Sequence, residues 1–277
     1  STVLIGQAWG AKNTDKVKQV AGTTITVTFL AGLVVAILGA VFVGNIMSVL
    51  GVPANIAAES TAYGRIVLIG MPGFFVFLIA TSILRGVGDT ITPLFSLILS
   101  ILAGRVTTPA LIEGWFGLPK LGVTAAAVAF IIGFLVVLVF LFFWLRARKH
   151  PLAPDRVFLQ HLRIDVPLLL QILRLGVPAG VQMIISSLAA VVVVGVVNRF
   201  GSNATAAYGA VGQVMSYVQF PAMSIGIATS IFGAQAIGAG QADQLSRITR
   251  TGLVMNLIIT GALILLAYAF SANIVGL

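Results

Sequence analysis

Residues 121–145, LGVTAAAVAFIIGFLVVLVFLFFWL, decide the fold of this chain because they contain no charged side chain and end directly before Arg146. About twenty consecutive apolar residues are enough for a helix to cross the hydrocarbon core of a bilayer. The apolar residues are continuous rather than alternating with polar ones, which favours a helix over a strand of a transmembrane barrel. The stretch is therefore predicted to be a transmembrane helix.

Further apolar runs surround this stretch, and 8% of the side chains in the whole chain are charged. About a quarter of the residues are charged in an ordinary soluble domain, so the composition excludes a soluble enzyme. The chain is predicted to be an all-α polytopic membrane protein with seven spans, while residues 1–11 are interpreted as the end of another helix rather than a signal peptide. The other six spans are predicted at residues 22–50, 62–84, 93–112, 170–198, 205–237 and 249–275.

The net charge of +9 is a signal of membrane topology rather than of nucleic-acid binding, because the basic residues are scattered and form no continuous stripe. Basic residues gather in the cytoplasmic loops of membrane proteins. If residues 12–18 are cytoplasmic, seven spans place most of the basic residues on that side and leave Arg65, Arg105, Lys120 and Arg199 outside. We therefore expect a multi-pass protein of the cell (inner) membrane that has no nucleic-acid partner.

An internal repeat is the second organising feature of the sequence. Aligning Gln7 with Gln235 sets a register of 228 residues, and this register contains six of the predicted spans. Both copies then enter the membrane in the same direction, as in transporters built from two parallel repeats. We expect two parallel-repeat helical bundles: a nearly complete N-terminal lobe over residues 1–145 and a truncated C-terminal lobe over residues 170–277. A cytoplasmic linker over residues 146–169 would join them, and the chain would be a fragment of a twelve-helix protein.

Three motifs resemble the multidrug and toxic compound extrusion (MATE) transporters. They are LRGVGDTITP at residues 84–93, GVP at residues 176–178, where a helix is expected to open, and GAQAIGAG at residues 233–240. The resemblance runs from late in the family's second helix to its ninth. It implies a central cavity between two lobes and export of organic cations or other amphipathic drugs by alternating access. It also implies an antiporter, which exchanges the drug for protons or sodium ions.

Polar residues within the spans are the candidates for the drug pathway. Gln182 and Ser186 are four residues apart and share one helix face, as do Gln213 and Tyr217, and Tyr208 lies nearby in the sequence. These residues either line a wet cavity or form hydrogen bonds that hold the helices together. The family resemblance also implies a departure, because Ser186 occupies the place where one sodium-coupled subgroup carries a glutamate.

The turn that contains Arg85, Gly86, Gly88 and Asp89 is a candidate gating motif. Its local chemistry also suits a purely structural turn, since glycine permits positive φ at a helix C-terminus and arginine complements the helix dipole there. The following Thr92-Pro93 is predicted to supply the N-cap and first residue of the next helix.

No acidic residue lies deep in a predicted span, and both histidines fall in the linker. We therefore predict no catalytic residues, no metal site, no cofactor and no enzymatic activity. The expected partners are a small-molecule drug or metabolite, a coupling proton or sodium ion, and the lipid bilayer, with the protein acting as a monomer. A lipid-linked oligosaccharide flippase is the alternative transporter, and a polytopic membrane enzyme is the alternative from another class.

Overall fold

The computed structural model describes the whole chain except residues 50–51, 54, 118, 156–157, 159 and 270–277. Every element of regular structure in the described part is helical, which confirms the predicted all-α class. The chain divides into two compact units. Unit 1 comprises Ser1–Trp9 and Asn13–Leu169, and unit 2 comprises Gly10–Lys12 and Leu170–Leu277.

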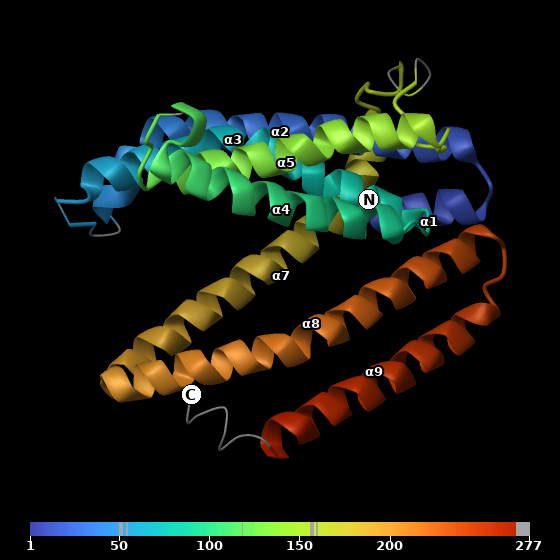
Figure 1. Cartoon of the computed structure of the whole chain (residues 1–277). Coiled ribbons are helices and arrows are strands. Elements are labelled where there is room, and N and C mark those ends of the chain that lie inside the picture. Colours follow the sequence, from blue (N-terminus) through green and yellow to red (C-terminus); the bar gives the residue numbers. More distant parts are fainter. Residues whose placement is uncertain (50–51, 54, 118, 156–157, 159, 270–277) are drawn as a thin grey trace. The chain divides into compact units, whose positions relative to one another are not determined.

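Among the described residues, five α-helices and a short 3-10 turn precede the linker, and three more helices follow it (Figure 1). Seven of these helices are long and apolar enough to cross a membrane, as the sequence predicts. The earlier elements are α1 (Thr2–Gly10), α2 (Thr14–Val49), α3 (Ala57–Gly86), α4 (Ile91–Glu113), η1 (Trp115–Gly117) and α5 (Thr124–Ala147). The later elements are α7 (Val166–Asn198), α8 (Ser202–Gly238) and α9 (Gln244–Ala269).

Glycines allow the long helices of unit 1 to approach one another closely. A Cβ atom added to Gly32 of α2 would lie 2.7 Å from the Cα atom of Pro72 in α3. One added to Gly73 of α3 would lie 2.5 Å from the ring of Phe134 in α5. Between helices in lipid, close packing replaces the hydrophobic effect as the main attraction. Unit 1 is therefore built around α3, which contacts α2, α4 and α5.

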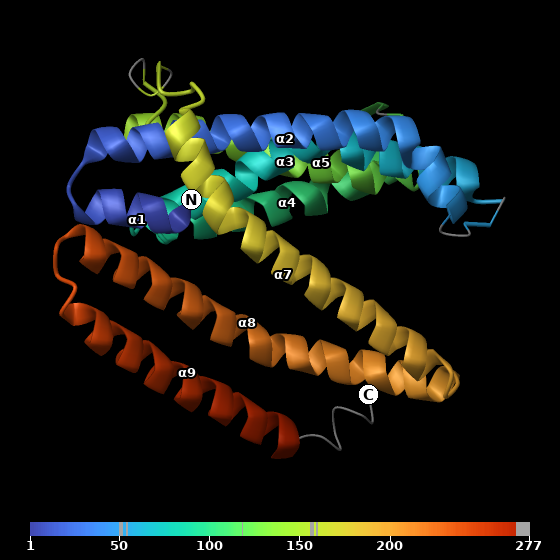
Figure 2. The same ribbon diagram turned by 180° about the vertical axis from the view of Figure 1, so that it is seen from behind.

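In unit 2, α8 and α9 pack together while α7 diverges from α8 beyond their common turn (Figure 2). A Cβ atom added to Gly252 of α9 would overlap the side chain of Thr229 in α8, so glycine is needed for this contact. The amide of Asn256 donates a hydrogen bond of 3.2 Å to the carbonyl oxygen of Ala222, and its own oxygen accepts one of 2.8 Å from Thr260. Asn256 thus joins α9 to α8.

The ends of α1 and α8 have the same backbone geometry, in agreement with the 228-residue register. Lys12 and Gly240, which are equivalent in that register, both have a left-handed backbone, with φ values of 56° and 73°. In each case the N–H group of the next residue donates a hydrogen bond to the carbonyl five residues earlier. This bond is typical of a Schellman motif, the turn that commonly closes a helix. These bonds run from Asn13 N to Ala8 O at 3.0 Å and from Gln241 N to Ala236 O at 2.9 Å.

Several helices begin before the apolar runs that predicted them, because polar side chains outside those runs cap their first turns. The Asn13 side chain accepts a hydrogen bond from Lys16 N at 2.9 Å, so α2 begins at Thr14 rather than at residue 22. The predicted opening of a helix at residues 176–178 is wrong for the same reason, since α7 begins at Val166 behind the cap Asp165. Residues 148–165, which lie between α5 and α7, fall within the expected linker of residues 146–169.

The N-cap prediction for Thr92 is also wrong. Helix α4 begins at Ile91, and the Oδ1 atom of Asp89 accepts a hydrogen bond of 3.0 Å from Thr92 N. Pro93 lies in the first turn, where its missing N–H has no intrahelical partner to lose. The acid of the candidate gating motif therefore caps the next helix.

The described residues of the segment 148–165, called the strap below, pack against the first turns of α2. The carboxylate of Asp165 makes two bonds at once: Oδ2 accepts from Gln19 Nε2 at 2.7 Å, and Oδ1 accepts from Leu168 N at 3.0 Å. The first turn of α7 is thereby fixed to α2 within unit 1. Other bonds from α2 to the strap are Lys18 Nζ to Asp155 Oδ2 at 3.0 Å, Thr23 Oγ1 to Arg163 O at 3.1 Å and Thr26 Oγ1 to Leu162 O at 3.2 Å.

Replacing Asp165 tests this double role. Asp165→Ala removes both the helix cap and the bond to Gln19, and we expect it to lower the free energy of unfolding by about 2 kcal/mol. Asp165→Asn keeps one acceptor oxygen for Leu168 N but places an NH2 donor where Oδ2 accepts from Gln19, so it should cost about half as much. Thermal unfolding of the purified protein in detergent measures both. Equal losses for the two variants would contradict the double role.

Candidate functional site

The five candidate pathway residues lie on the two diverging helices of unit 2. Gln182 and Ser186 are on α7, while Tyr208, Gln213 and Tyr217 are on α8, and all five side chains are exposed or nearly so within the described chain. In this part of the chain none of them has a hydrogen-bond partner. Their exposure contrasts with Asn256, which holds α8 and α9 together.

The candidates on α7 and α8 lie at similar distances, measured along each helix, from the turn that joins these helices. At 1.5 Å of rise per residue, Gln182 is about 24 Å from the turn between α7 and α8, and Tyr217 is roughly 22 Å from it. Ser186 and Gln213 are likewise about 18 Å and about 17 Å from the same turn. No direct contact joins the two pairs among the described residues. Each pair thus combines residues at similar distances along their helices from the common turn, but their side chains are not in contact.

The candidate gating motif forms a third Schellman turn. Gly88 has φ 89°, and the N–H groups of Gly88 and Asp89 donate to the carbonyls of Arg85 and Leu84, both at 3.0 Å. A Cβ atom added to Gly86 would lie 2.9 Å from Cγ2 of Ile5, so α1 packs closely against the end of α3. The geometry of all four motif residues has a structural explanation, and a gating role stays a prediction.

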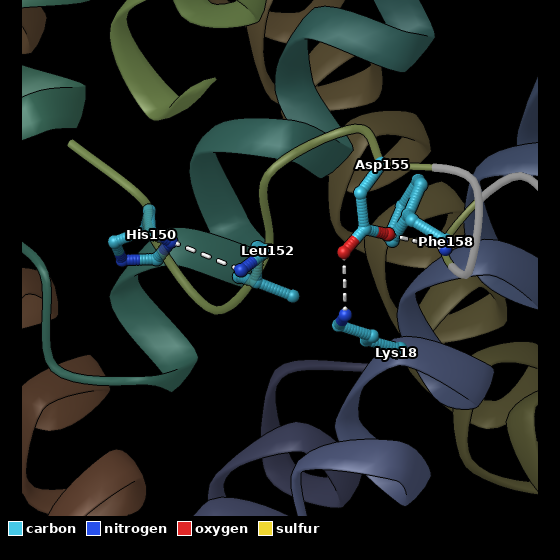
Figure 3. Close-up of polar contacts among 5 residues, drawn as sticks. All are labelled: Lys18, His150, Leu152, Asp155 and Phe158. Carbon is cyan, nitrogen blue, oxygen red and sulfur yellow. Dashed lines mark hydrogen bonds and ion pairs between the residues drawn. The ribbon is translucent and has the colours of Figure 1, made fainter. Parts of the chain in front are cut away.

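Asp89 also faces the strap, a contact that sequence reasoning missed. Its Oδ2 atom lies 3.9 Å from Nε2 of His150, and Nδ1 of His150 accepts a hydrogen bond of 3.2 Å from Leu152 N. Because Nδ1 is an acceptor, the proton of the neutral ring is on Nε2, which faces the carboxylate. Figure 3 shows the His150–Leu152 bond beside the contacts of Asp155.

Two groups of the strap region have shifted pKa values. Burial lowers the pKa of His150, and the charge of Asp89 opposes this effect. The pKa of Asp155 is lowered by the hydrogen bond of 2.6 Å from Phe158 N, then by the contact with Lys18 (Figure 3). At neutral pH these shifts favour a neutral His150 beside Asp89 and a charged Asp155 beside Lys18.

The acids of the chain lie at helix ends, in turns or in the strap, as the sequence indicates. Among the described residues, no group of three or more His, Cys, Asp or Glu side chains could hold a metal ion. The neutral pathway candidates can bind a ligand through amide and hydroxyl dipoles and aromatic faces. Tyrosine faces attract organic cations.

Comparison with known proteins decides the family. The family model described as MatE matches residues 1–109 and 178–277. The chain belongs to the MATE family. Because MATE proteins are transporters, this places it apart from enzymes, and its seven spans place it in the membrane as a multi-pass protein.

Relatives and solved structures agree with this assignment. The "Probable multidrug resistance protein YoeA" of Bacillus subtilis is 48% identical over the whole chain. The "Probable multidrug resistance protein NorM" of Thermotoga maritima is 26% identical over 93% of the chain and 55% of its own length. The chain spans 60% of the length of the B. subtilis relative.

Solved MATE structures share the fold. "Crystal structure of MATE in the bent conformation" matches 99% of this chain and 60% of its own, with a TM-score of 0.87 and 21% identity. "Outward-facing conformation of a multidrug resistance MATE family transporter of the MOP superfamily" matches 99% of this chain and 60% of its own, with a TM-score of 0.84 and 20% identity.

The shifted pKa of His150 predicts how the stability of this MATE chain depends on pH. The folded state holds His150 neutral below its ordinary pKa of 6.5, so the unfolded chain takes up a proton first as the pH falls. Stability is therefore lost as the pH falls through about 6.5 toward the lower folded-state value. Thermal unfolding of the wild type between about pH 7.5 and about pH 5.5 should show a larger loss than that of His150→Gln.

Asp89→Asn provides the control for this experiment. The asparagine keeps an oxygen to cap α4 but removes the negative charge that favours protonated His150. The loss of stability on acidification should then be larger than in the wild type. Identical pH profiles for the wild type and His150→Gln would show that His150 does not contribute.

Proposed function

We propose that this chain forms part of a secondary transporter that exports organic cations or other amphipathic drugs in exchange for protons or sodium ions. Its two units would be the lobes whose relative movement gives alternating access. The proposal is supported by membership of the MATE family and by relatives named as multidrug resistance proteins. A small-molecule drug or metabolite and the coupling ion would be its partners, and the transporter would act as a monomer.

The observation that carries the proposal for this chain is the set of polar side chains left uncovered on α7 and α8. An amide or hydroxyl that faces lipid without a partner is costly. Gln182 and Ser186 have no hydrogen-bond partner in the described part of unit 2, so a wet, ligand-accessible surface explains them better than lipid contact. Tyr208 and Tyr217, which are 40% and 66% exposed, would offer aromatic faces to a cationic drug.

The coupling ion would bind away from these five residues. None of them carries a charge at neutral pH, whereas protons and sodium ions are usually bound through a carboxylate in transporters. The described acids lie outside the middle of the spans. The candidates on α7 and α8 would therefore contribute to drug binding rather than to ion binding.

Gln182→Ala tests the pathway in the complete gene product. Loss of one hydrogen bond to a ligand should lower the export of a cationic dye from membrane vesicles by about fivefold. The melting temperature should stay nearly unchanged, because the side chain has no partner to lose within its unit. Export driven in turn by an imposed proton gradient and an imposed sodium gradient would identify the coupling ion.

Asn256→Ala is the matched control, because this polar residue joins α8 and α9. It should reduce the free energy of unfolding by about 1 kcal/mol while transport per folded molecule is kept. If Gln182→Ala instead behaves like this control, Gln182 holds helices together and the pathway assignment is wrong. Absence of dye export by the wild type under either gradient would contradict the proposed function itself.

A further inference from the structure

An apolar cavity of about 220 Å³ lies in unit 1 between the strap and the ends of α2, α3 and α5. All of its lining side chains are apolar. Two of them, Ala21 of α2 and Ala80 of α3, are small and leave space, while Leu152 and Phe158 of the strap cover the cavity. Protein interiors are close-packed, and voids larger than a water molecule are few. A cavity of this size therefore needs an explanation.

The cavity is suited to an apolar group rather than to water. A buried water needs two to four polar partners, whereas purely apolar cavities stay dry and take up apolar molecules. Along α5 the lining extends from Leu138 to Leu145, a distance of about 10 Å at 1.5 Å per residue. The space can thus accept a segment of a hydrocarbon chain.

One wall of the cavity is exposed. Phe142 of α5 is 41% exposed, whereas the lining residues Ala21, Leu84 and Leu141 are buried. Phe142 lies within a candidate membrane span, and no residue of the described part of unit 1 covers this side of its ring. An acyl chain can therefore enter the cavity from the lipid phase beside Phe142.

A cation without an anionic partner lies at this wall. The guanidinium carbon of Arg146 is 6.0 Å from the centre of the Phe142 ring. In the described part of the chain Arg146 has no hydrogen bond or ion pair, whereas Lys18 pairs with Asp155. Arg148 and Lys149 follow directly in the sequence. The basic residues assign this end of the unit to the cytoplasmic surface.

We propose that this cavity and Arg146 form a binding site for an anionic phospholipid of the cytoplasmic leaflet. One acyl chain occupies the apolar cavity beneath the strap, and the phosphate lies at the guanidinium of Arg146. The apolar cavity, which opens beside Phe142, suits the acyl chain. The guanidinium of Arg146, which lies beside the same ring, suits the phosphate. Basic pockets between helices on the cytoplasmic side bind lipid headgroups in this way. The site is separate from the drug pathway proposed on α7 and α8.

The test uses the complete gene product, purified and delipidated in detergent. Phosphatidylglycerol and phosphatidylcholine with identical acyl chains are titrated separately, and the bound fraction is measured by native mass spectrometry. The wild type should bind phosphatidylglycerol about fivefold more tightly, because one basic residue recognises the negative charge. Arg146→Gln should remove this preference, because it weakens the binding of phosphatidylglycerol more than that of phosphatidylcholine.

Filling the cavity tests the acyl chain. Ala21→Leu and Ala80→Leu each place a larger side chain in the space, and each should weaken phosphatidylglycerol binding by at least about tenfold, since several methylene groups lose their contact. Ala31→Leu is the matched control, on the same helix as Ala21 but exposed. It should bind both lipids like the wild type. The two filling variants are independent, so either one that folds is sufficient.

Three outcomes would overturn the proposal. The first is equal binding of both phospholipids by the wild type. The second is unchanged phosphatidylglycerol binding in a folded variant with a filled cavity. The third is displacement of the lipid by a cationic dye whose own binding is lost in Ala21→Leu, because the cavity would then be a drug-binding site. Because the readout is lipid binding, a failure of the proposed transport function would not affect these results.

Discussion

The hydrocarbon core of the bilayer offers no hydrogen-bond partners, and this constraint explains most of the structure. Each backbone N–H and C=O group within the membrane must be satisfied inside its own helix. Polar interactions are consequently concentrated at the helix ends. Asn13, Asp89 and Asp165 each accept a backbone N–H at the start of a helix, while left-handed residues close the preceding ones. The hydrogen bonds that join the strap to α2 lie near such an end as well.

The two units meet this constraint to different degrees. In unit 1, glycines bring α3 into close contact with its neighbours, and the buried hydroxyl group of Ser96 donates to the carbonyl oxygen of Thr92. In unit 2, α8 and α9 are joined through Gly252 and Asn256, but α7 has polar residues with nothing packed on them in that unit. Unit 1 is therefore closely packed, whereas the polar face of α7 is uncovered within the described part of unit 2.

The number and type of the helices could be predicted from the sequence because the apolar runs are long and uncharged. Helix starts were less predictable, since the caps Asn13 and Asp165 lie outside those runs. The docking of the strap could not be predicted, because Gln19 and Asp165 are far apart in the sequence and meet through tertiary folding. The signal available in the sequence was that both of these positions carry a polar residue. For Gln182 and Ser186, sequence identified the helix face, but what covers that face depends on neighbouring helices.

The left-handed conformation of Lys12 and Lys149, with φ values of 56° and 49°, has a consequence for how the chain is inserted during synthesis. Glycine would adopt this conformation without the steric cost of about 1 kcal/mol that a side chain incurs. Lysine keeps a positive charge directly at the helix end, where the translocation machinery reads it as a cytoplasmic anchor. Biogenesis and folding thus place opposing demands on these two residues, and a glycine chosen to stabilise either turn would weaken the signal that orients the spans.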